Sequence, residues 1–178
     1  MAVYSRTEKN KALYRQHRVR RWLTSTLLAL AAALFLFCVW LHPLRIGNAS
    51  MAPTFEDRAV VVADRLEKYL RDPERTDIVW FAEDGAARVR RIVAMPGETV
   101  SGRDGHVCVN GDYLLTEPYI ESETADFEPF TVPEGQVLCL PDNRIYFTGM
   151  DAETYCLPLS SIKGIVHLKI LPERRYYR

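Results

Sequence analysis

RVRRIVAMPGETV, residues 88–100, contains the pattern on which the fold prediction rests. Arginines lead into a β-branched, apolar run, and Pro96-Gly97 then interrupts it. A short β-branched run that stops at a Pro-Gly pair is typical of a sheet strand followed by a turn. The stretch therefore predicts a strand that ends before residue 96.

Short runs of the same kind recur on both sides of this stretch. They are rich in β-branched and aromatic residues, and they occupy residues 59–64, 77–81, 107–111, 136–140 and 165–171. Asp104-Gly105 and Asn110-Gly111 favour the positive φ angles of tight hairpin turns. Residues 64–74 are compatible with a helix and equally with a long loop. The sequence therefore predicts one mostly β domain over residues 43–178.

The segment before this domain is uniformly apolar. WLTSTLLALAAALFLFCVWL, residues 22–41, has no charged residue and matches the roughly 20 residues that a membrane-spanning helix needs. Trp22 and Trp40 lie near its ends, where interfacial aromatic residues belong. We expect a single-pass transmembrane anchor over residues 22–42. A cleaved signal peptide, whose apolar core is usually about 7–15 residues long, and a buried core helix are the alternatives.

The charges are divided unevenly between the two sides of the anchor. Residues 1–21 contain seven of the 23 basic and one of the 23 acidic residues, which leaves 16 basic and 22 acidic residues for the domain. Because basic flanks stay inside, residues 1–21 are expected to be a cytoplasmic tail and residues 43–178 to lie outside the plasma membrane. The lipid bilayer is thus an expected partner, and the acidic domain argues against nucleic acid.

The four cysteines do not indicate a metal site. Cys38 lies in the apolar segment, and Cys108, Cys139 and Cys156 follow it without a Cys-x-x-Cys pair. An exported domain permits one disulfide, but small buried apolar residues fit the pattern better. Neither a metal nor another cofactor is expected.

GNASMAPTF, residues 47–55, follows the anchor. Ser50 lies nine residues beyond Leu41, so a chain that extends by about 3.3 Å per residue keeps it near the outer membrane surface. Met51 is expected to expose apolar surface there. A lone serine in a loop is ordinarily a turn or capping residue, and Asn48-Ala49-Ser50 also matches a glycosylation sequon. The stretch alone therefore assigns no function to Ser50.

Five stretches, in the same order, resemble the boxes of bacterial type I signal peptidases. GNASMAPTF resembles the serine box Ser-Met-x-Pro-Thr, and TDIVWF (76–81) resembles Gly-Asp-Ile-Val. VRRIVAMPGETV (89–100) resembles Lys-Arg-Val-x-Gly-x-Pro-Gly-Asp/Glu. GHVCVNGDYLLTEPYI (105–120) resembles Val-Asn-Gly…Leu…Glu-x-Tyr, and VPEGQVLCLPDNR (132–144) resembles Val-Pro-x-Gly…Gly-Asp-Asn-Arg. The shared order, with an anchor before the serine, makes the resemblance specific.

The resemblance implies a signal-peptidase-like antiparallel β domain and a membrane-bound serine endopeptidase. Such an enzyme removes signal peptides from exported precursor proteins at the outer face of the membrane. Ser50 would be the nucleophile, Asn48 and the Ser50 N–H would bind the oxyanion, and Met51 would line a shallow substrate groove. Asp142 and Arg144 would support the site, most simply as an ion pair that fixes a turn.

The sequence departs from the family at the general base. The family pairs its serine with a lysine, which accepts the hydroxyl proton once burial lowers its pKa. Counting back from Pro96-Gly97 places Arg90 at that position, and a guanidinium group stays protonated. The Ser-x-Asp-Ser-Arg motif expected after Arg144 is also absent, and only Thr148 and Asp151 resemble parts of it.

Whether the chain is an active enzyme therefore stays open at the level of sequence. The first interpretation is a working signal peptidase with a different base, and the remaining lysines after the anchor are Lys68, Lys163 and Lys169. The second is a catalytically silent relative that binds exported polypeptides or assists the assembly of surface proteins. The third is a membrane-tethered β domain with a structural role. Because Ser50 is present, we favour the first.

Overall fold

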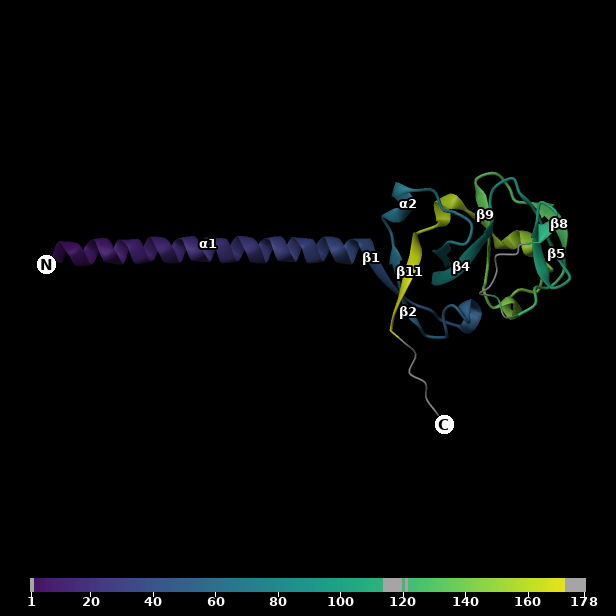
Figure 1. The fold of residues 1–178 in the computed structure, drawn as a ribbon, viewed down its shortest axis with the longest axis horizontal. Helices are drawn as coiled ribbons and strands as arrows, with labels where there is room; N and C mark the ends of the chain where they lie inside the picture. The colour runs from purple at the N-terminus through teal and green to yellow at the C-terminus, as the bar shows by residue number, and fades with distance from the viewer. Residues whose placement is uncertain (1, 114–119, 121, 172–178) are drawn as a thin grey trace, which may run out of the picture. The chain divides into compact units, whose positions relative to one another are not determined.

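The computed structural model describes residues 2–113, 120 and 122–171. The chain forms two compact units, Met1–Trp40 and Leu41–Arg178. The first unit is helical, and the second contains the strands of the predicted mostly β domain (Figure 1). Residues 114–119, part of one of the five family-like stretches, lie outside the described residues.

One helix, α1 (Ala2–Trp40), contains both the basic tail and the apolar run. Its segment His17–Phe37 is long and apolar enough to cross a membrane and is not buried in the structure, which is compatible with a transmembrane anchor. The helix ends two residues before the expected boundary at residue 42. Leu41 and His42 instead begin strand β1 (Leu41–Arg45), because Pro43 disfavours helical geometry at the residue before it.

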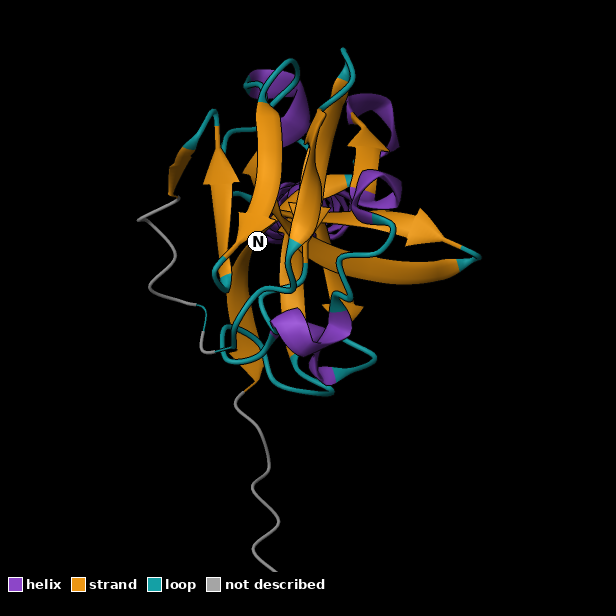
Figure 2. Ribbon diagram, turned by 90° about the vertical axis from the view of Figure 1, so that its right-hand side faces the viewer, coloured by secondary structure: helices purple, strands orange, loops and turns teal. Residues whose placement is uncertain are grey.

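Two antiparallel sheets build the β domain, and Figure 2 shows their strands in orange with the short helices around them. The larger sheet has the order β1 (Leu41–Arg45), β2 (Val60–Asp64), β11 (Gly164–Leu171), β3 (Ile78–Glu83), β4 (Ala86–Ala94), β9 (Gln136–Leu140), β10 (Cys156–Pro158). The smaller sheet has the order β7 (Asp112–Tyr113), β6 (His106–Val109), β5 (Thr99–Arg103), β8 (Phe127–Thr131). All six strand runs predicted from the sequence are confirmed, and all described pairings are antiparallel.

The turns and short helices agree with the local sequence signals. Asp104 and Gly105 have φ angles of 52° and 78°, and Asn110 and Gly111 have φ angles of 54° and 89°, as the hairpin prediction requires. Within residues 64–74, the helix is limited to α2 (Glu67–Leu70). The remaining short helices are η1 (Ala49–Met51), η2 (Arg144–Tyr146), η3 (Ala152–Tyr155) and η4 (Leu159–Ser161).

Cross-strand pairing determines which side chains share a face of the larger sheet. Val89 pairs with Trp80, and Arg90 pairs with Val79. Because successive residues of a strand point to opposite faces, Val89 and Arg90 lie on opposite faces of β4. Val89 and Trp80 belong to a buried cluster that also contains Leu44, Ile46, Met51, Phe55, Ala59, Val61, Ala63 and Val166. Val79 belongs to a second cluster, with Ile92, Val137, Cys139, Ile162 and Ile165.

The three cysteines of the β domain are free. Cys108 and Cys139 are buried, as expected for small apolar residues, and Cys156 is half-buried. Burial raises the pKa of the Cys139 thiol to about 12, so this side chain stays protonated and behaves as an apolar group.

Candidate active site

Ser50 lies on the short turn η1 between strands β1 and β2. Asn48 has an extended backbone (φ −159°, ψ 173°) and caps this turn, because its Oδ1 accepts the Ser50 N–H at 3.1 Å. Asparagine is a favoured capping residue for this reason. The cap orders the backbone at Ser50 and thereby restricts the position of its hydroxyl group.

The same cap changes the expectation for the oxyanion site. That expectation requires the Ser50 N–H and the Asn48 side chain to point at one substrate oxygen. Here the Ser50 N–H is donated to Asn48 Oδ1 instead. The Asn48 side chain must therefore rotate before the Ser50 N–H binds a substrate oxygen.

Met51 differs from its expected role as an exposed groove residue. Its side chain is 0% exposed and packs in the cluster that contains Phe55, Trp80 and Val89. Burying an apolar side chain of this size contributes roughly 1.5–3 kcal/mol, which explains its inward orientation. Met51 therefore anchors η1 to the core and does not line a groove at the surface.

A buried ion pair lies next to the Ser50 turn. Arg91 donates to both carboxylate oxygens of Asp142, from Nε at 2.8 Å and from Nη2 at 2.6 Å. Thr54, four residues after Ser50, donates its hydroxyl to Asp142 Oδ2 at 2.6 Å. Arg91 Nη1 also donates to Thr76 O at 3.0 Å. Charge-assisted, bidentate contacts of this kind are strong and geometrically specific, so they fix the segment that follows Ser50 against β4.

Asn143 attaches the Ser50 turn to the segment after β9. Its backbone N–H donates to Ser50 O at 2.9 Å, and its Nδ2 donates to Ala49 O at 3.3 Å. Its Oδ1 accepts from the Ile145 N–H at 3.2 Å and caps η2. The serine is therefore positioned by two segments that lie about ninety residues apart in the chain.

Asp142 and Arg144 support the turn, but with partners other than those expected. The ion pair of Asp142 within the described chain is formed with Arg91 of β4, whereas the sequence suggested Arg144. The backbone N–H of the buried Arg144 donates to Ser122 Oγ at 2.8 Å, and its Nη1 donates to Thr124 Oγ1 at 3.5 Å. Each residue thus joins the turn to a different segment.

A small hollow of about 120 Å³ lies beside Ser50. Residues 46–48 and Ser50 line one side, and residues 86–89 of β4 line the other. β4 pairs with β9 only from Arg91 onward, so residues 86–90 have no strand partner on this edge among the described residues. The hollow therefore combines a serine hydroxyl with an open strand edge. An extended polypeptide binds such an edge backbone to backbone.

The hollow itself offers no general base. Of its eight lining residues, Arg88 has the one ionisable side chain, and a guanidinium group cannot accept a proton. A hydroxyl group is a weak nucleophile until a neighbouring base removes its proton. The described lining therefore contains a serine and an open strand edge, but no side chain that can accept a proton from the serine.

The side chain of Arg90 lies on one face of β4. Val89 lies on the other face, where it packs in the buried cluster that also contains Met51. The guanidinium carbon of Arg90 is 5.3 Å from the ring centroid of Phe81 and 4.5 Å from that of Tyr155. Its Nη2 is 3.5 Å from Glu83 Oε2. Cation–π contacts and an ion pair thus hold the residue at the predicted base position.

The alternative bases have other contacts. Lys68 Nζ donates to Ile162 O at 3.0 Å and lies 4.8 Å from the ring of Tyr69, and Lys163 is exposed. The side chain of Lys169 lies outside the described part of the chain. Burial and the charge of Arg65 lower the pKa of His42, but its ring stacks on Trp80 at 5.3 Å.

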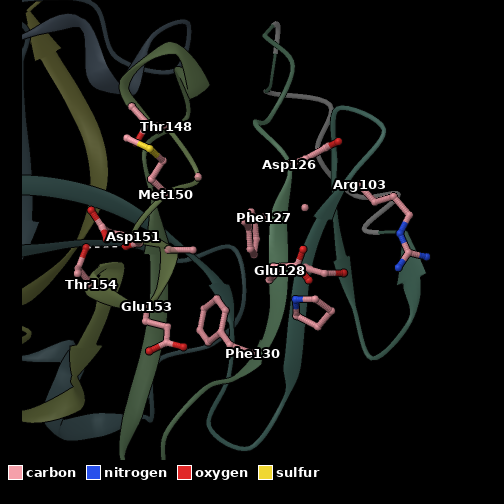
Figure 3. Close-up of a pocket in the computed structure, with 15 residues that line it drawn as sticks. Arg103, Asp126, Phe127, Glu128, Phe130, Thr148, Met150, Asp151, Glu153 and Thr154 are labelled. Atoms are coloured by element: carbon pink, nitrogen blue, oxygen red, sulfur yellow. Dashed lines mark hydrogen bonds between the residues drawn. The ribbon is translucent and has the colours of Figure 1, made fainter.

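A larger hollow of about 730 Å³ lies between strands β5 and β8 and residues 148–154. Figure 3 shows four acidic side chains around it, Asp126, Glu128, Asp151 and Glu153. Thr148 and Asp151, which resemble parts of the Ser-x-Asp-Ser-Arg motif, line this hollow. None of its lining residues belongs to the site predicted around Ser50.

The sequence interpretation missed three residues that position the serine: Thr54, Arg91 and Asn143. All three stand inside the family-like stretches, each within a few residues of a predicted site residue. Their position inside the family-like stretches could have identified them as candidate site residues. Their hydrogen bonds join three separate segments, so the sequence alone could not show them.

Residues 19–146 match the family described as signal peptidase, peptidase S26. Signal peptidase I of Bacillus licheniformis is 28% identical over 149 residues, which cover 76% of this chain and 80% of that protein. Signal peptidase I T of Bacillus subtilis (strain 168) is 31% identical over 134 residues, which cover 68% of this chain and 67% of that protein.

A solved structure is also similar. The crystal structure of a signal peptidase I from Enterococcus faecalis V583 has a TM-score of 0.44 and 26% sequence identity. The aligned part covers 55% of this chain and 98% of that one.

Proposed function

The chain belongs to the signal peptidase family S26, and we propose that it is a membrane-anchored serine endopeptidase that cleaves signal peptides from exported proteins at the outer face of the membrane. The bacterial relatives are signal peptidases I by name, which supports the peptidase class. The apolar helix α1 before the β domain supports the anchor, and the basic residues in its first half support a cytoplasmic N-terminus.

The observation that carries this proposal is the open edge of β4 beside Ser50. An extended precursor segment adds to residues 86–90, and one of its side chains enters the hollow of about 120 Å³. A hollow of this size, with Gly47, Ala86 and Ala87 in its lining, suits a small side chain. Ser50 then attacks the carbonyl carbon at the end of the bound segment. The account predicts Ser50 as nucleophile and Asn48 as an oxyanion donor after its side chain rotates.

The general base is the unassigned part of this mechanism. Arg90 stands at the lysine position but stays protonated, so its proposed role is positioning rather than proton transfer. A base from outside the described lining must accept the Ser50 proton when substrate is bound.

A catalytically silent relative that binds exported polypeptides is the second candidate function. The observation that favours it is the set of contacts around Arg90, because Glu83, Phe81 and Tyr155 hold a residue that cannot act as a base. This candidate uses the same β4 edge, but Ser50 has no chemical role in it.

Substitution of Ser50 separates the two candidates. In bacterial cells that depend on this chain, Ser50→Ala is expected to reduce conversion of an exported precursor by roughly 10³-fold or more, because a serine nucleophile has no substitute. Pulse-labelled precursor and mature protein are measured on gels. Ser160→Ala, at an exposed serine on η4, is the matched control and should process normally. Precursor processing by Ser50→Ala at the normal rate would contradict the peptidase and leave the binding function.

A further inference from the structure

The open edge of β4 has two chemically different faces. Ala87 and Val89 point to the face that packs with the Ser50 turn, and Val89 is buried there. Arg88 pairs with Phe81 and Arg90 pairs with Val79, so both arginines point to the other face. A peptide strand that adds to this edge presents its side chains alternately to these two faces.

The arginine face carries an excess of positive charge. Arg88 Nε is 3.2 Å and Arg90 Nη2 is 3.5 Å from the same carboxylate oxygen, Glu83 Oε2. Two guanidinium groups thus share one carboxylate, which leaves one positive charge on the group of three. The side chains of Arg88, Glu83 and Arg90 are 42%, 36% and 16% exposed, so the group is accessible from the solvent side of the edge.

Arg90 and the rings beside it hold this group in place. The guanidinium of Arg90 lies between Phe81, whose centroid is 5.3 Å away, and Tyr155, whose centroid is 4.5 Å away. This leaves Arg88, the more exposed of the two, to face a strand added at residues 86–90. Side chains directly opposite each other on neighbouring strands are close enough for opposite charges to attract.

We propose that Arg88, supported by the positive charge of Arg90, selects polypeptides with an acidic side chain in the segment that pairs with β4. This inference rests on the proposed binding of an extended polypeptide at that edge. The acidic side chain lies on the face of β4 that carries the side chains of Arg88 and Arg90. It therefore alternates along the peptide with the small side chain that lies on the face of Ala87 and Val89 and enters the hollow. Arg88 is a specificity-determining residue, not a proton acceptor.

Peptide binding to the full-length Ser50→Ala protein in detergent micelles tests the inference without requiring cleavage. The probes are fluorescent ten-residue peptides that span the cut site of an exported precursor, with Glu, Gln or Lys placed in turn at each of the last four positions before the cut. Glu is expected to lower the Kd by about twofold to fivefold relative to Gln, and Lys to raise it similarly. Because side chains alternate, this charge effect should occur at every second position.

Three variants define the expected outcome further. Arg88→Glu should reverse the preference from Glu to Lys at the same positions. Glu83→Gln removes the competing carboxylate and should strengthen binding of the Glu peptides, so the inference stays testable if Arg88→Glu unfolds in a thermal scan. Arg103→Gln, at an exposed arginine of β5 in the other sheet, should leave the preference unchanged.

The inference is overturned by equal Kd values for all three residues at every position, by a preference that persists in Arg88→Glu, or by no measurable binding of any peptide. Its failure is distinguishable from failure of the proposed function. Cleavage that depends on Ser50 without a charge preference removes only the inference. A charge preference without any Ser50-dependent cleavage removes the peptidase and leaves the binding edge.

Discussion

Arg91 and Asp142 are the residues on which the position of the Ser50 turn most depends. Their side chains are only 10% and 1% exposed, and two hydrogen bonds join them across fifty-one positions of the sequence. The cost of removing water from two such charges is offset only while both partners are present. Loss of either partner removes the opposite charge that stabilises the other in the interior.

Asp142→Asn is therefore expected to lower the free energy of unfolding by about 3–5 kcal/mol, because it removes the negative charge that is paired with the buried guanidinium group of Arg91. The measurement is denaturant unfolding of the purified chain in detergent. Asp57→Asn is the matched control: its ion pair with Arg58 is 48% and 76% exposed on the two side chains and should contribute less than about 1 kcal/mol. Equal losses of unfolding free energy in the two variants would show that the buried Arg91–Asp142 pair stabilises the fold no more than the exposed pair does.

For single residues, the sequence predicted which ones lie near the Ser50 turn better than it predicted their contacts. The family resemblance placed Ser50 and Asn48 together as oxyanion donors, and the structure describes them as a turn in which Asn48 caps the Ser50 N–H. The contacts of Arg90 with Tyr155 were not predictable, because η3 reaches β4 only through the fold. Met51 was predicted to be exposed from its place after the anchor, but the apolar cluster beneath the turn buries it.

Five of the described strands were missed from the sequence, β1, β5, β7, β8 and β10, and three of them share one physical property. β1, β8 and β10 each contain a proline, Pro43, Pro129 and Pro158. A proline argues against a central strand, since it cannot donate a ladder hydrogen bond. β1 and β10 are the two edges of the larger sheet, and β8 is an edge of the smaller one, where that bond is not needed. The six predicted runs were found because they are rich in β-branched and aromatic residues.

Gly102 is the glycine on which the smaller sheet most depends. It lies on β5 opposite Phe127 of β8, and a Cβ at this position would lie 2.6 Å from Ala125 O and overlap the Phe127 ring. Gly102→Ala is therefore expected to reduce stability by about 1–3 kcal/mol. Thermal unfolding of the purified chain measures the loss. Gly47→Ala serves as control, because a Cβ there meets nothing within 4 Å, and it should not lower stability. A similar loss at both glycines would contradict the packing described for β5 and β8.

The whole molecule divides into an apolar helix with a basic start and a β domain that carries the serine. The difference in composition between the two parts is visible in the sequence, and the helix ends at Trp40. The division into a cytoplasmic tail, an anchor and an extracytoplasmic domain stays a prediction. The hollow beside Ser50 could not be predicted, because residues 46–50 and 86–89 meet only through the sheet.

The most direct test of this account is the N-terminus of the product released from an exported precursor. Purified full-length chain is incubated with the precursor in lipid vesicles, and the product is identified by mass spectrometry. The account predicts one new N-terminus, immediately after the precursor's apolar segment, with the unsubstituted chain and none with Ser50→Ala. The same product from both proteins, or no product from either, would contradict it.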